Sequence, residues 1–333
     1  MYIKPKENTE MKAFVLKQYN TPGWVELHEL AMPELEAGKV RVRIKAFSVN
    51  PVDYKIAKGA FTLPLPRVIG IDFAGIIEQT GADVFGFVEG QHVFGLANLF
   101  TQGTFAEYVD VDQFALSRMP AGLSFAEAAV IPCAGITAWQ AVMQKVVIPQ
   151  GSNVFITSGG GGVGGFAIQF AHLLGANVIT TASKNFQRIY GLGASHIINY
   201  KTESIKDRIM ELTAQEGVHA VIDMVSPESA YENAKLLRYN GAIVSIQGRP
   251  EQWPFDPFTK AITMAEVALG AAYVSGDKES LREMAKAGEV IAKLIVEKKV
   301  DPMISHEYRF DQLQQALSQV SSRTTEGKVV VLV

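Results

Sequence analysis

A run of glycines between an apolar segment and a helical pattern is the feature that most constrains this chain. Residues 153–157 are rich in Val, Phe, Ile and Thr, which is typical of a strand buried on both faces. From Val163 to Leu174 apolar residues recur at a helical period, and Gly175 follows where a C-terminal cap belongs. The glycines lack a Cβ, so a pyrophosphate can approach the backbone N–H groups at the positive end of the helix. The segment predicts a strand, a phosphate-binding turn and a helix.

The spacing G-x-G-x-x-G fits this run in two registers, of which we favour the one on Gly159, Gly161 and Gly164. A glycine-rich surface turn is the alternative interpretation, because a lone motif of this kind is weak evidence. The context favours a dinucleotide site, since a second strand-like segment at 177–181 closes a βαβ unit. No Gly-Lys-Ser/Thr follows, which excludes a P-loop. The predicted cofactor contacts in the turn are Gly159, Gly161, Gly162, Val163 and Gly164.

The end of the second strand indicates which dinucleotide binds. An acidic residue about 20 residues further on would bind the ribose 2′-hydroxyl of NAD. The segment VITTASKN has no carboxylate there and offers Ser183 and Lys184 instead. A hydroxyl and an ammonium suit a 2′-phosphate, so NADPH is the predicted cofactor. The alternative is that Lys184 is a solvated loop residue, as most lysines are.

Length and charge limit the class of protein. A chain of 333 residues is long enough for two domains, because single hydrophobic cores stop growing at about 250–300 residues. The formal charge of −3 is nearly balanced and no block of Lys and Arg stands out, which argues against nucleic acid or an anionic membrane as the main partner. A small-molecule substrate is expected instead.

Cysteine usage and hydropathy bear on the compartment. The single cysteine, Cys133, excludes an intramolecular disulfide framework and fits a reducing compartment. The N-terminal segment is polar and lacks the apolar region of a secretory signal. The most apolar long stretch, 125–143, contains Glu127 and Pro132, so no membrane span is expected. A cytoplasmic protein is predicted.

The order of elements predicts a β-rich segment followed by an α/β segment. Expected strands before residue 124 are 12–17, 40–47, 74–77, 92–95 and 105–111. From Ser124 the pattern becomes an Ala-rich helix, and strands then alternate with helices, which predicts a doubly wound parallel sheet. Its expected strands are 154–157, 178–181, 196–198, 220–224 and 242–246. Two amphipathic helices within 281–295 and 313–320 and a terminal strand at 328–333 follow, which suggests that the tail returns to the first domain.

The segment LGAAYVS at 269–275 predicts an outermost sixth strand of the parallel sheet. No proline or charge interrupts it, and an exposed apolar edge favours pairing with another chain. We therefore expect a homodimer in which this strand pairs antiparallel with its copy. The alternative is an edge that the chain's own helices cover.

Several segments spread over nearly the whole chain carry a resemblance to a known family. They are SVNPVDYKIAKG, VIGIDFAGIIEQTG, GTFAEYV, AAVIPCAGITAW, the SGGGGVGG turn, LGASHIINY and the terminal GKVVVLV. In this order and spacing they resemble the medium-chain dehydrogenase/reductase superfamily, and within it the zinc-free quinone oxidoreductase branch. The resemblance implies an α/β fold in which a doubly wound Rossmann NADP(H)-binding domain of residues 134–275, with a parallel sheet, interrupts a GroES-like catalytic domain of residues 1–133 and 276–333.

No metal site is expected. A catalytic zinc needs three protein ligands of Cys, His or Glu type. By the resemblance, the ligand positions of zinc-dependent relatives fall on Asn50, on Ile71 in Gly-Ile-Asp, and on Cys133, so one ligand of three remains. Cys133 is interpreted as a small buried residue, and the six histidines are scattered singly. Without zinc, and with Val52 at the position of the Ser/Thr proton relay, alcohol oxidation is disfavoured.

The remaining chemistry is hydride transfer to a quinone or an enone, with the protein positioning the cofactor. The resemblance assigns Asn50 and Thr137 to the nicotinamide carboxamide. A turn residue and a residue at a helix N-terminus are the alternative interpretations. The resemblance also adds Tyr200 and Arg323 to Lys184 at the 2′-phosphate.

Two further positions complete the predicted site. Gly248 ends the fifth strand and is expected near the nicotinamide, because ligands bind at the carboxyl ends of open parallel sheets. Tyr54 is a possible proton donor, with a packing role as the alternative. Two other functions stay open: reduction of other activated double bonds or carbonyls, and a non-catalytic NADPH-binding sensor.

Overall fold

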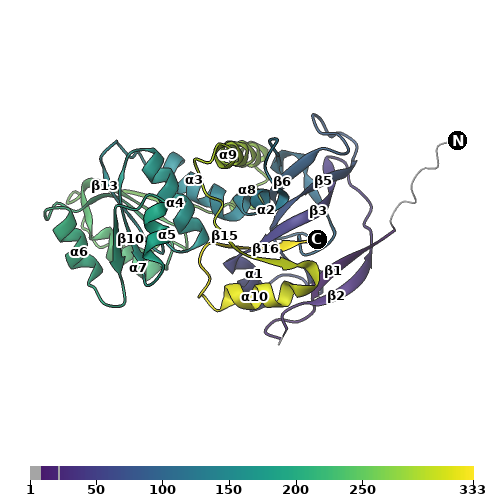
Figure 1. Cartoon of the computed structure of the whole chain (residues 1–333), viewed down its shortest axis with the longest axis horizontal. Helices are drawn as coiled ribbons and strands as arrows, with labels where there is room; N and C mark the ends of the chain where they lie inside the picture. Colours follow the sequence, from purple (N-terminus) through teal and green to yellow (C-terminus); the bar gives the residue numbers. More distant parts are fainter. Residues whose placement is uncertain (1–8, 22) are drawn as a thin grey trace. The chain divides into compact units, whose positions relative to one another are not determined.

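The computed structural model describes residues 9–21 and 23–333, and contacts between Cα atoms divide the chain into two units. The first unit runs to Cys133 and also includes Ala272–Val296 and Ile304–Val333. The second unit consists of Ala134–Ala271 and Glu297–Met303. In Figure 1 the second unit contains the teal and green elements around β10 and β13.

The first unit is built on two β-sheets. The larger contains β3 (Lys39–Val49), β5 (Asp72–Thr80), β6 (His92–Leu96), β7 (Tyr108–Asp112), β8 (Leu116–Arg118), β15 (Ile304–Arg309) and β16 (Lys328–Leu332). These seven strands have the order β15-β16-β3-β5-β6-β8, and β7 also pairs with β3. A three-stranded sheet, β2-β1-β4, contains β1 (Glu10–Leu16), β2 (Glu26–Ala31) and β4 (Arg67–Val68).

The C-terminal strand belongs to the N-terminal sheet. β16 pairs antiparallel with β3, with Val329 opposite Val49 and Leu332 opposite Ala46. Helices of this unit include α1 (Pro51–Ala57), α2 (Phe125–Ala129), α9 (Lys278–Val296) and α10 (Leu313–Ser321). The tail therefore returns to the first sheet, as the order of the elements predicted.

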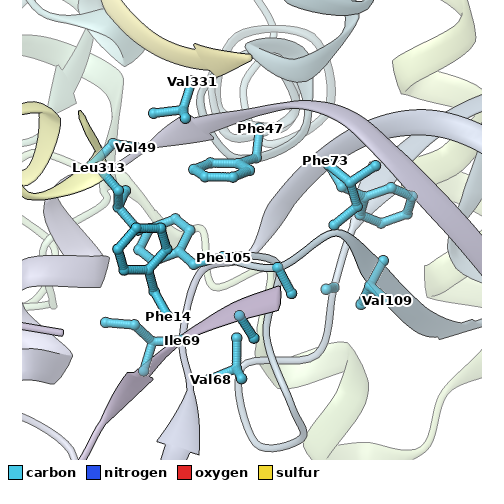
Figure 2. Close-up of a cluster of buried hydrophobic side chains, with 14 of the residues drawn as sticks. Phe14, Phe47, Val49, Val68, Ile69, Phe73, Phe105, Val109, Leu313 and Val331 are labelled. Atoms are coloured by element: carbon cyan, nitrogen blue, oxygen red, sulfur yellow. The ribbon is translucent and has the colours of Figure 1, made fainter. Parts of the chain in front are cut away.

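Buried aromatic side chains fill the core of the first unit. The ring centroids of Phe47 and Phe105 are 4.9 Å apart. Figure 2 shows both rings together with Leu313 and Val331 from the C-terminal segment. Because α10 and β16 supply part of this core, the position of the last strand is set by packing as well as by its hydrogen bonds.

The second unit contains a six-stranded sheet in which all neighbouring strands are parallel. Its strands are β9 (Asn153–Ile156), β10 (Asn177–Ala182), β11 (His196–Asn199), β12 (Val218–Asp223), β13 (Leu237–Ser245) and β14 (Thr263–Glu266). The order β11-β10-β9-β12-β13-β14 is the doubly wound order 3-2-1-4-5-6. The predicted parallel, doubly wound sheet is confirmed.

Helices connect these strands and contribute to a second core. They are α3 (Ile136–Trp139), α4 (Gly162–Leu173), α5 (Phe186–Gly191), α6 (Ile205–Leu212) and α7 (Pro227–Ala234). Phe155, Ile179 and Val221 of the sheet are buried in one cluster with Ile209 of α6. Two π-helical segments, Ile131–Gly135 and Gln140–Gln144, flank α3. The pattern of apolar residues around 125–143 predicted a helix but not this change of winding.

The prediction of a sixth strand at 269–275 is wrong. Residues Ala271–Ser275 form a short helix, α8, and the sixth strand is β14 at Thr263–Glu266. The run contains consecutive alanines, and alanine is the strongest helix former, so local propensity favours a helical turn over a strand. The hydroxyl of Tyr273 on α8 donates a hydrogen bond to the carbonyl of Leu96. Pairing of this run with its copy through a strand edge is therefore excluded, whereas the homodimer itself stays a prediction.

In the described ranges, 9–21 and 23–333, none of the helices combines the length and apolar character needed to cross a bilayer.

Candidate cofactor and active site

The glycine turn joins β9 to α4 with little room for side chains. A Cβ built on Gly159 would lie 2.4 Å from Oγ1 of Thr180, and one on Gly164 would lie 2.2 Å from the carbonyl oxygen of Ser158. A Cβ on Gly161 would come no closer than 3.4 Å to that same oxygen. Gly159 and Gly164 are thus required by packing, whereas the backbone at Gly161 is open to a ligand. This matches the different roles of the glycines in a dinucleotide-binding turn.

The start of α4 offers unused donors. Gly161 is the N-cap residue, and the first helical hydrogen bond runs from the N–H of Gly165 to its carbonyl, at 2.9 Å. The N–H groups of Gly162, Val163 and Gly164 precede that bond and have no acceptor within the helix. Together with the positive end of the helix dipole, they suit a pyrophosphate. The residues present therefore fit a dinucleotide.

Three of the residues predicted at the 2′-phosphate follow neighbouring strands of the sheet. Ala182 of β10 is opposite Asn199 of β11, so Ser183 and Tyr200 leave the sheet at the same edge. The Tyr200 hydroxyl lies 3.3 Å from Oγ of Ser183, and the Tyr200 side chain is half exposed. Lys184 comes next and is exposed. The structure thus brings Ser183, Lys184 and Tyr200 to one edge of the sheet.

Arg323 belongs to the other unit. It follows α10, is exposed, and has a left-handed backbone with a φ of 57°. Its role beside Lys184 and Tyr200 stays a prediction.

The carboxyl end of β13 is a second place where a ligand can bind in the parallel sheet. Gly248 lies just beyond this strand with a φ of 106°, a conformation that favours glycine. Ser245, the last residue of the strand, is buried, and its Oγ has no hydrogen-bond partner in the part of the chain described. The sequence did not indicate that the Ser245 hydroxyl is buried without a partner, because the burial of that hydroxyl depends on the neighbouring strands. Thr137 lies on α3 and is 7% exposed, and its contact with the nicotinamide stays a prediction.

Asn50 is the centre of a buried polar network in the first unit. It lies between β3 and α1, with Pro51 as the first helical residue, and its backbone N–H donates to Oδ2 of Asp53 at 2.7 Å. Its side-chain Nδ2 donates to Oδ2 of Asp72 at 2.7 Å. Its Oδ1 accepts from Nζ of Lys328 at 2.5 Å. Asn50, Asp72 and Lys328 are 1%, 0% and 4% exposed, so water does not screen these contacts.

Asp72 is the better stabilised of the two buried carboxyl groups. Besides Asn50, it accepts from Oγ of Ser48 at 2.5 Å and from the N–H of Cys133 at 2.8 Å, and Nζ of Lys328 lies 3.9 Å away. Burial raises the pKa of Asp72, and the Lys328 ammonium and these donors oppose that rise. Its ionised form therefore has a counter-ion and several donors.

Asp53 has much weaker support for a negative charge. Burial raises its pKa to about 8, only the Asn50 N–H opposes this through a hydrogen bond, and its Oδ1 has no partner within the described residues. The arrangement with Asp53 protonated, Asp72 ionised and Lys328 charged leaves no net charge in the core. That is the favourable arrangement, because an uncompensated buried charge is strongly destabilising.

The positions that correspond to zinc ligands in zinc-dependent relatives lie in this same network. Asn50 contacts Lys328 and Asp72, Ile71 is buried, and the backbone of Cys133 donates to Asp72. Burial raises the pKa of the Cys133 thiol, which disfavours the thiolate that binds metals. Over the described ranges no three His, Cys, Asp or Glu side chains come together in a way that would hold a metal ion. The cation in contact with Asn50 and Asp72 is the Lys328 ammonium.

Tyr54 is part of the core of the first unit. It is 5% exposed, its ring centroid lies 6.5 Å from that of Trp24, and Nζ of Lys58 lies 5.4 Å from the Tyr54 ring centroid. These contacts support the packing role, and proton donation by its hydroxyl stays a prediction.

Sequence reasoning missed Lys328, Ser48 and Asp53 as members of this network. The available signal was a lysine at the start of an otherwise apolar terminal strand, KVVVL. Such a lysine is normally exposed, and only the pairing of β16 with β3 places it beside Asn50.

A Rossmann unit combined with a GroES-like β unit is the fold of two-domain dehydrogenases. Residues 36–121 match the family described as alcohol dehydrogenase GroES-like domain, and residues 162–289 match the family described as zinc-binding dehydrogenase. A zinc-type alcohol dehydrogenase-like protein of Schizosaccharomyces pombe is 32% identical over 91% of this chain and 93% of its own length. The chain belongs to the medium-chain dehydrogenase/reductase superfamily and is an oxidoreductase.

Two further relatives have named activities. The 2-methylene-furan-3-one reductase of Solanum lycopersicum is 29% identical to this chain, and the similarity covers 97% of this chain and 79% of that protein. The structure of the quinone oxidoreductase from Coxiella burnetii is similar with a TM-score of 0.83 and 30% identity, covering 97% of this chain and 99% of that one. One is a reductase by name and the other an oxidoreductase that acts on quinones.

Proposed function

We propose that this oxidoreductase uses NADPH to transfer hydride to a quinone or another electron-poor enone, without a zinc ion. The observation that carries the proposal is the buried contact of Lys328 with Asn50 and Asp72. A zinc ion at Asn50 would have to be accommodated beside an ammonium group that already neutralises Asp72. An amide and a protonated thiol are also poor zinc ligands.

The second unit supplies the cofactor part of the proposal. The N–H groups of Gly162, Val163 and Gly164 would hold the pyrophosphate, and Ser183, Lys184 and Tyr200 would hold the 2′-phosphate through charge-assisted hydrogen bonds. NADPH, when bound, supplies the hydride. Asn50 and Thr137 would orient the nicotinamide carboxamide. The chain's own contribution is therefore mainly positioning.

A specific observation keeps a second substrate class in view. The tomato relative, at 29% identity, is named as a reductase of a methylene-furanone, which is an activated double bond rather than a quinone. Both classes are electron-poor acceptors that need no Lewis acid. A panel of acceptors separates them.

The test measures oxidation of NADPH and of NADH by absorbance, with quinones, α,β-unsaturated ketones and simple aldehydes as acceptors. We expect turnover with quinones or enones, a preference for NADPH, and little activity with aldehydes or in the oxidation of alcohols. Turnover of alcohols with NADP⁺ and none with quinones or enones would contradict the proposal. Binding of NADPH without reduction of any acceptor would favour the sensor.

Metal dependence is the second prediction of this proposal. Purified protein should contain no stoichiometric zinc, and prolonged treatment with a chelator should leave the rate unchanged, because Asn50 and Asp72 are already in contact with an ammonium cation. Elemental analysis and activity before and after dialysis against the chelator are the measurements. One zinc per chain, with activity lost on its removal and restored by its return, would show that the site is metal-dependent.

A further inference from the structure

Ser158, at the start of the glycine turn, has a backbone conformation that L-amino acids rarely adopt. Its φ is 56°, in the left-handed region, although it is not a glycine. Such a conformation costs free energy and persists where neighbouring contacts hold it. Ser158 lies between β9 and the helix α4, so its conformation sets the direction in which the chain runs toward that helix. The contacts that hold Ser158 therefore bear on the cofactor site.

Thr181, on the neighbouring strand β10, supplies two of these contacts. Its Oγ1 accepts a hydrogen bond from the N–H of Ser158 at 3.0 Å, and its backbone carbonyl accepts one from the N–H of Gly159 at 3.0 Å. Two successive N–H groups of the turn are thus bound to a single residue, which is 5% exposed. The bond to the carbonyl could form with any residue at this position, whereas the bond from Ser158 needs a side-chain oxygen.

The conformation of Ser158 affects the start of α4 through its carbonyl group. That carbonyl accepts from the N–H of Gly161 at 3.0 Å, and Gly161 is the N-cap of the helix. The hydrogen bonds thus run from Thr181 to Ser158 and from Ser158 to Gly161, which precedes the N–H groups of residues 162–164 that have no acceptor within the helix. A change in the φ of Ser158 would move its carbonyl and, with it, the start of α4.

We propose that Thr181 is a positioning residue for the cofactor: its hydroxyl oxygen holds Ser158 in the left-handed conformation that directs the N–H groups of residues 162–164 toward the pyrophosphate. This role rests on the proposed function and deepens it. Thr181 comes two residues before Ser183, so the strand β10 fixes the pyrophosphate turn with one side chain and presents the residues proposed for the 2′-phosphate at its end.

The test measures the binding of two ligands, NADPH and adenosine 2′-phosphate, by calorimetric titration. Thr181→Val keeps the shape of the side chain and removes the acceptor of the Ser158 N–H. Fewer molecules then have the turn in its binding conformation, so the apparent Kd rises in proportion. We expect the Kd for NADPH to rise about tenfold, as for the loss of one buried hydrogen bond. The Kd for adenosine 2′-phosphate, which has no pyrophosphate, should stay the same.

Two variants test whether the effect passes through Ser158. Thr181→Ser keeps an oxygen at the same position and should bind NADPH nearly as the wild type does. Thr181→Val combined with Ser158→Gly should recover most of the lost affinity, because glycine adopts a positive φ without the cost that serine has. If Thr181→Val does not fold, Thr181→Ser and Thr181→Ala differ by the hydroxyl alone, and we expect a difference of about tenfold in their Kd for NADPH.

Thr213→Val is the matched control. Thr213 is also 5% exposed, and its Oγ1 accepts from the N–H of Gly217 at 3.1 Å, just before the amino end of β12. The substitution removes a hydrogen bond of the same kind at the end of the sheet opposite to the carboxyl ends, where ligands bind. It should lower the thermal stability and leave the Kd of both ligands at the wild-type value.

The outcomes separate the positioning role from the function on which it rests. If the wild-type protein binds NADPH and Thr181→Val binds it with the same Kd, or if Ser158→Gly brings no recovery, the positioning role is wrong while the proposed function stands. Equal weakening of both ligands by Thr181→Val, or weakening of NADPH by Thr213→Val to the same extent, would show a general effect on the fold and would also exclude the role. If the wild-type protein binds neither ligand, the proposed function fails, and the positioning role fails with it.

Discussion

At the scale of single residues, the buried carboxyl groups of the first unit differ through their neighbours. Asp72 has Lys328, Asn50, Ser48 and the Cys133 N–H around it, whereas Asp53 has the Asn50 N–H. Each is a short acidic side chain in a similarly buried place. Their ionisation is decided by contacts with residues far away in the sequence.

The raised pKa of Asp53 predicts a pH-dependent stability. Its pKa is about 8 in the folded chain against an ordinary 3.8, so between these values the folded state holds a proton that the unfolded state has lost. Stability should therefore fall as pH rises through this window, by up to about 1.4 kcal/mol per pH unit. Asp53→Asn keeps an acceptor for the Asn50 N–H but does not titrate.

Urea unfolding of wild type and Asp53→Asn at pH 5, 6, 7 and 8 is the measurement. The free energy of unfolding of the wild type should decrease relative to that of the variant as pH rises, since all other titrating groups are common to both. A difference that stays constant over this range would show that Asp53 is ionised in the folded state.

We expect Lys184 to determine the preference for NADPH over NADH. Lys184→Ala should raise the KM for NADPH by about tenfold to a hundredfold and leave that for NADH nearly unchanged, because a hydrogen bond to a charged group contributes about 1.5–3 kcal/mol. Steady-state kinetics with both cofactors measure this. Lys206→Ala, an exposed lysine on α6, is the matched control. An equal effect of Lys184→Ala on both cofactors would remove Lys184 from the 2′-phosphate site.

At the scale of elements, the turn between β9 and α4 depends on close approach of the backbone. Gly164→Ala would place a Cβ 2.2 Å from the Ser158 carbonyl, a contact with backbone that cannot be relieved by a side-chain rotation. We expect a loss of about 1–3 kcal/mol of stability and weakened NADPH binding. Thermal unfolding and calorimetric titration measure the two effects.

Gly191→Ala is the control for that change. Gly191 is the last residue of α5, and a Cβ there would meet nothing within 4 Å. The substitution should be neutral or stabilising by up to about 1 kcal/mol, because alanine restricts the unfolded chain more than glycine does. Equal effects of Gly164→Ala and Gly191→Ala would contradict the close packing at the turn.

At the scale of the whole molecule, the parallel sheet of the second unit has β11 at one edge and β14 at the other. The N–H of Val267 donates to the carbonyl of Ser245 in β13. Because the N–H groups alternate in direction along a strand, those of Thr263 and Ala265 also point toward β13, whereas those of Met264 and Glu266 point away from the sheet. A homodimer that pairs through the β14 edge would use the N–H groups of Met264 and Glu266 for hydrogen bonds between the two chains. We therefore expect the predicted dimer, if it pairs through a strand edge, to use β14 and not LGAAYVS.

Light scattering at micromolar concentration tests the assembly. We expect about twice the chain mass of 36.3 kDa for wild type and the monomer mass for Met264→Pro, which removes one outward N–H without removing a bond to β13. Ala272→Pro lies in α8 and should not change the oligomeric state through a strand edge. A wild-type monomer, or a Met264→Pro dimer, would show that β14 does not form the interface.

The sequence by itself determined the features that depend on neighbouring residues. The glycine turn, its flanking strand and helix, and the alternation of strands and helices up to β13 follow from spacing and local sterics, and all of them are present in the structure. The prediction of a strand for LGAAYVS was wrong, because the apolar residues of this run fit a short helix as well as a strand.

Only the tertiary structure decided the environment of Asn50. Lys328 lies 278 positions away in the sequence, and it reaches Asn50 because β16 pairs with β3 and packs on the aromatic core. No periodicity links these residues, since such contacts arise from the pairing of strands distant in sequence. The sequence identified Asn50 as a candidate, whereas the charges that orient its amide come from the fold.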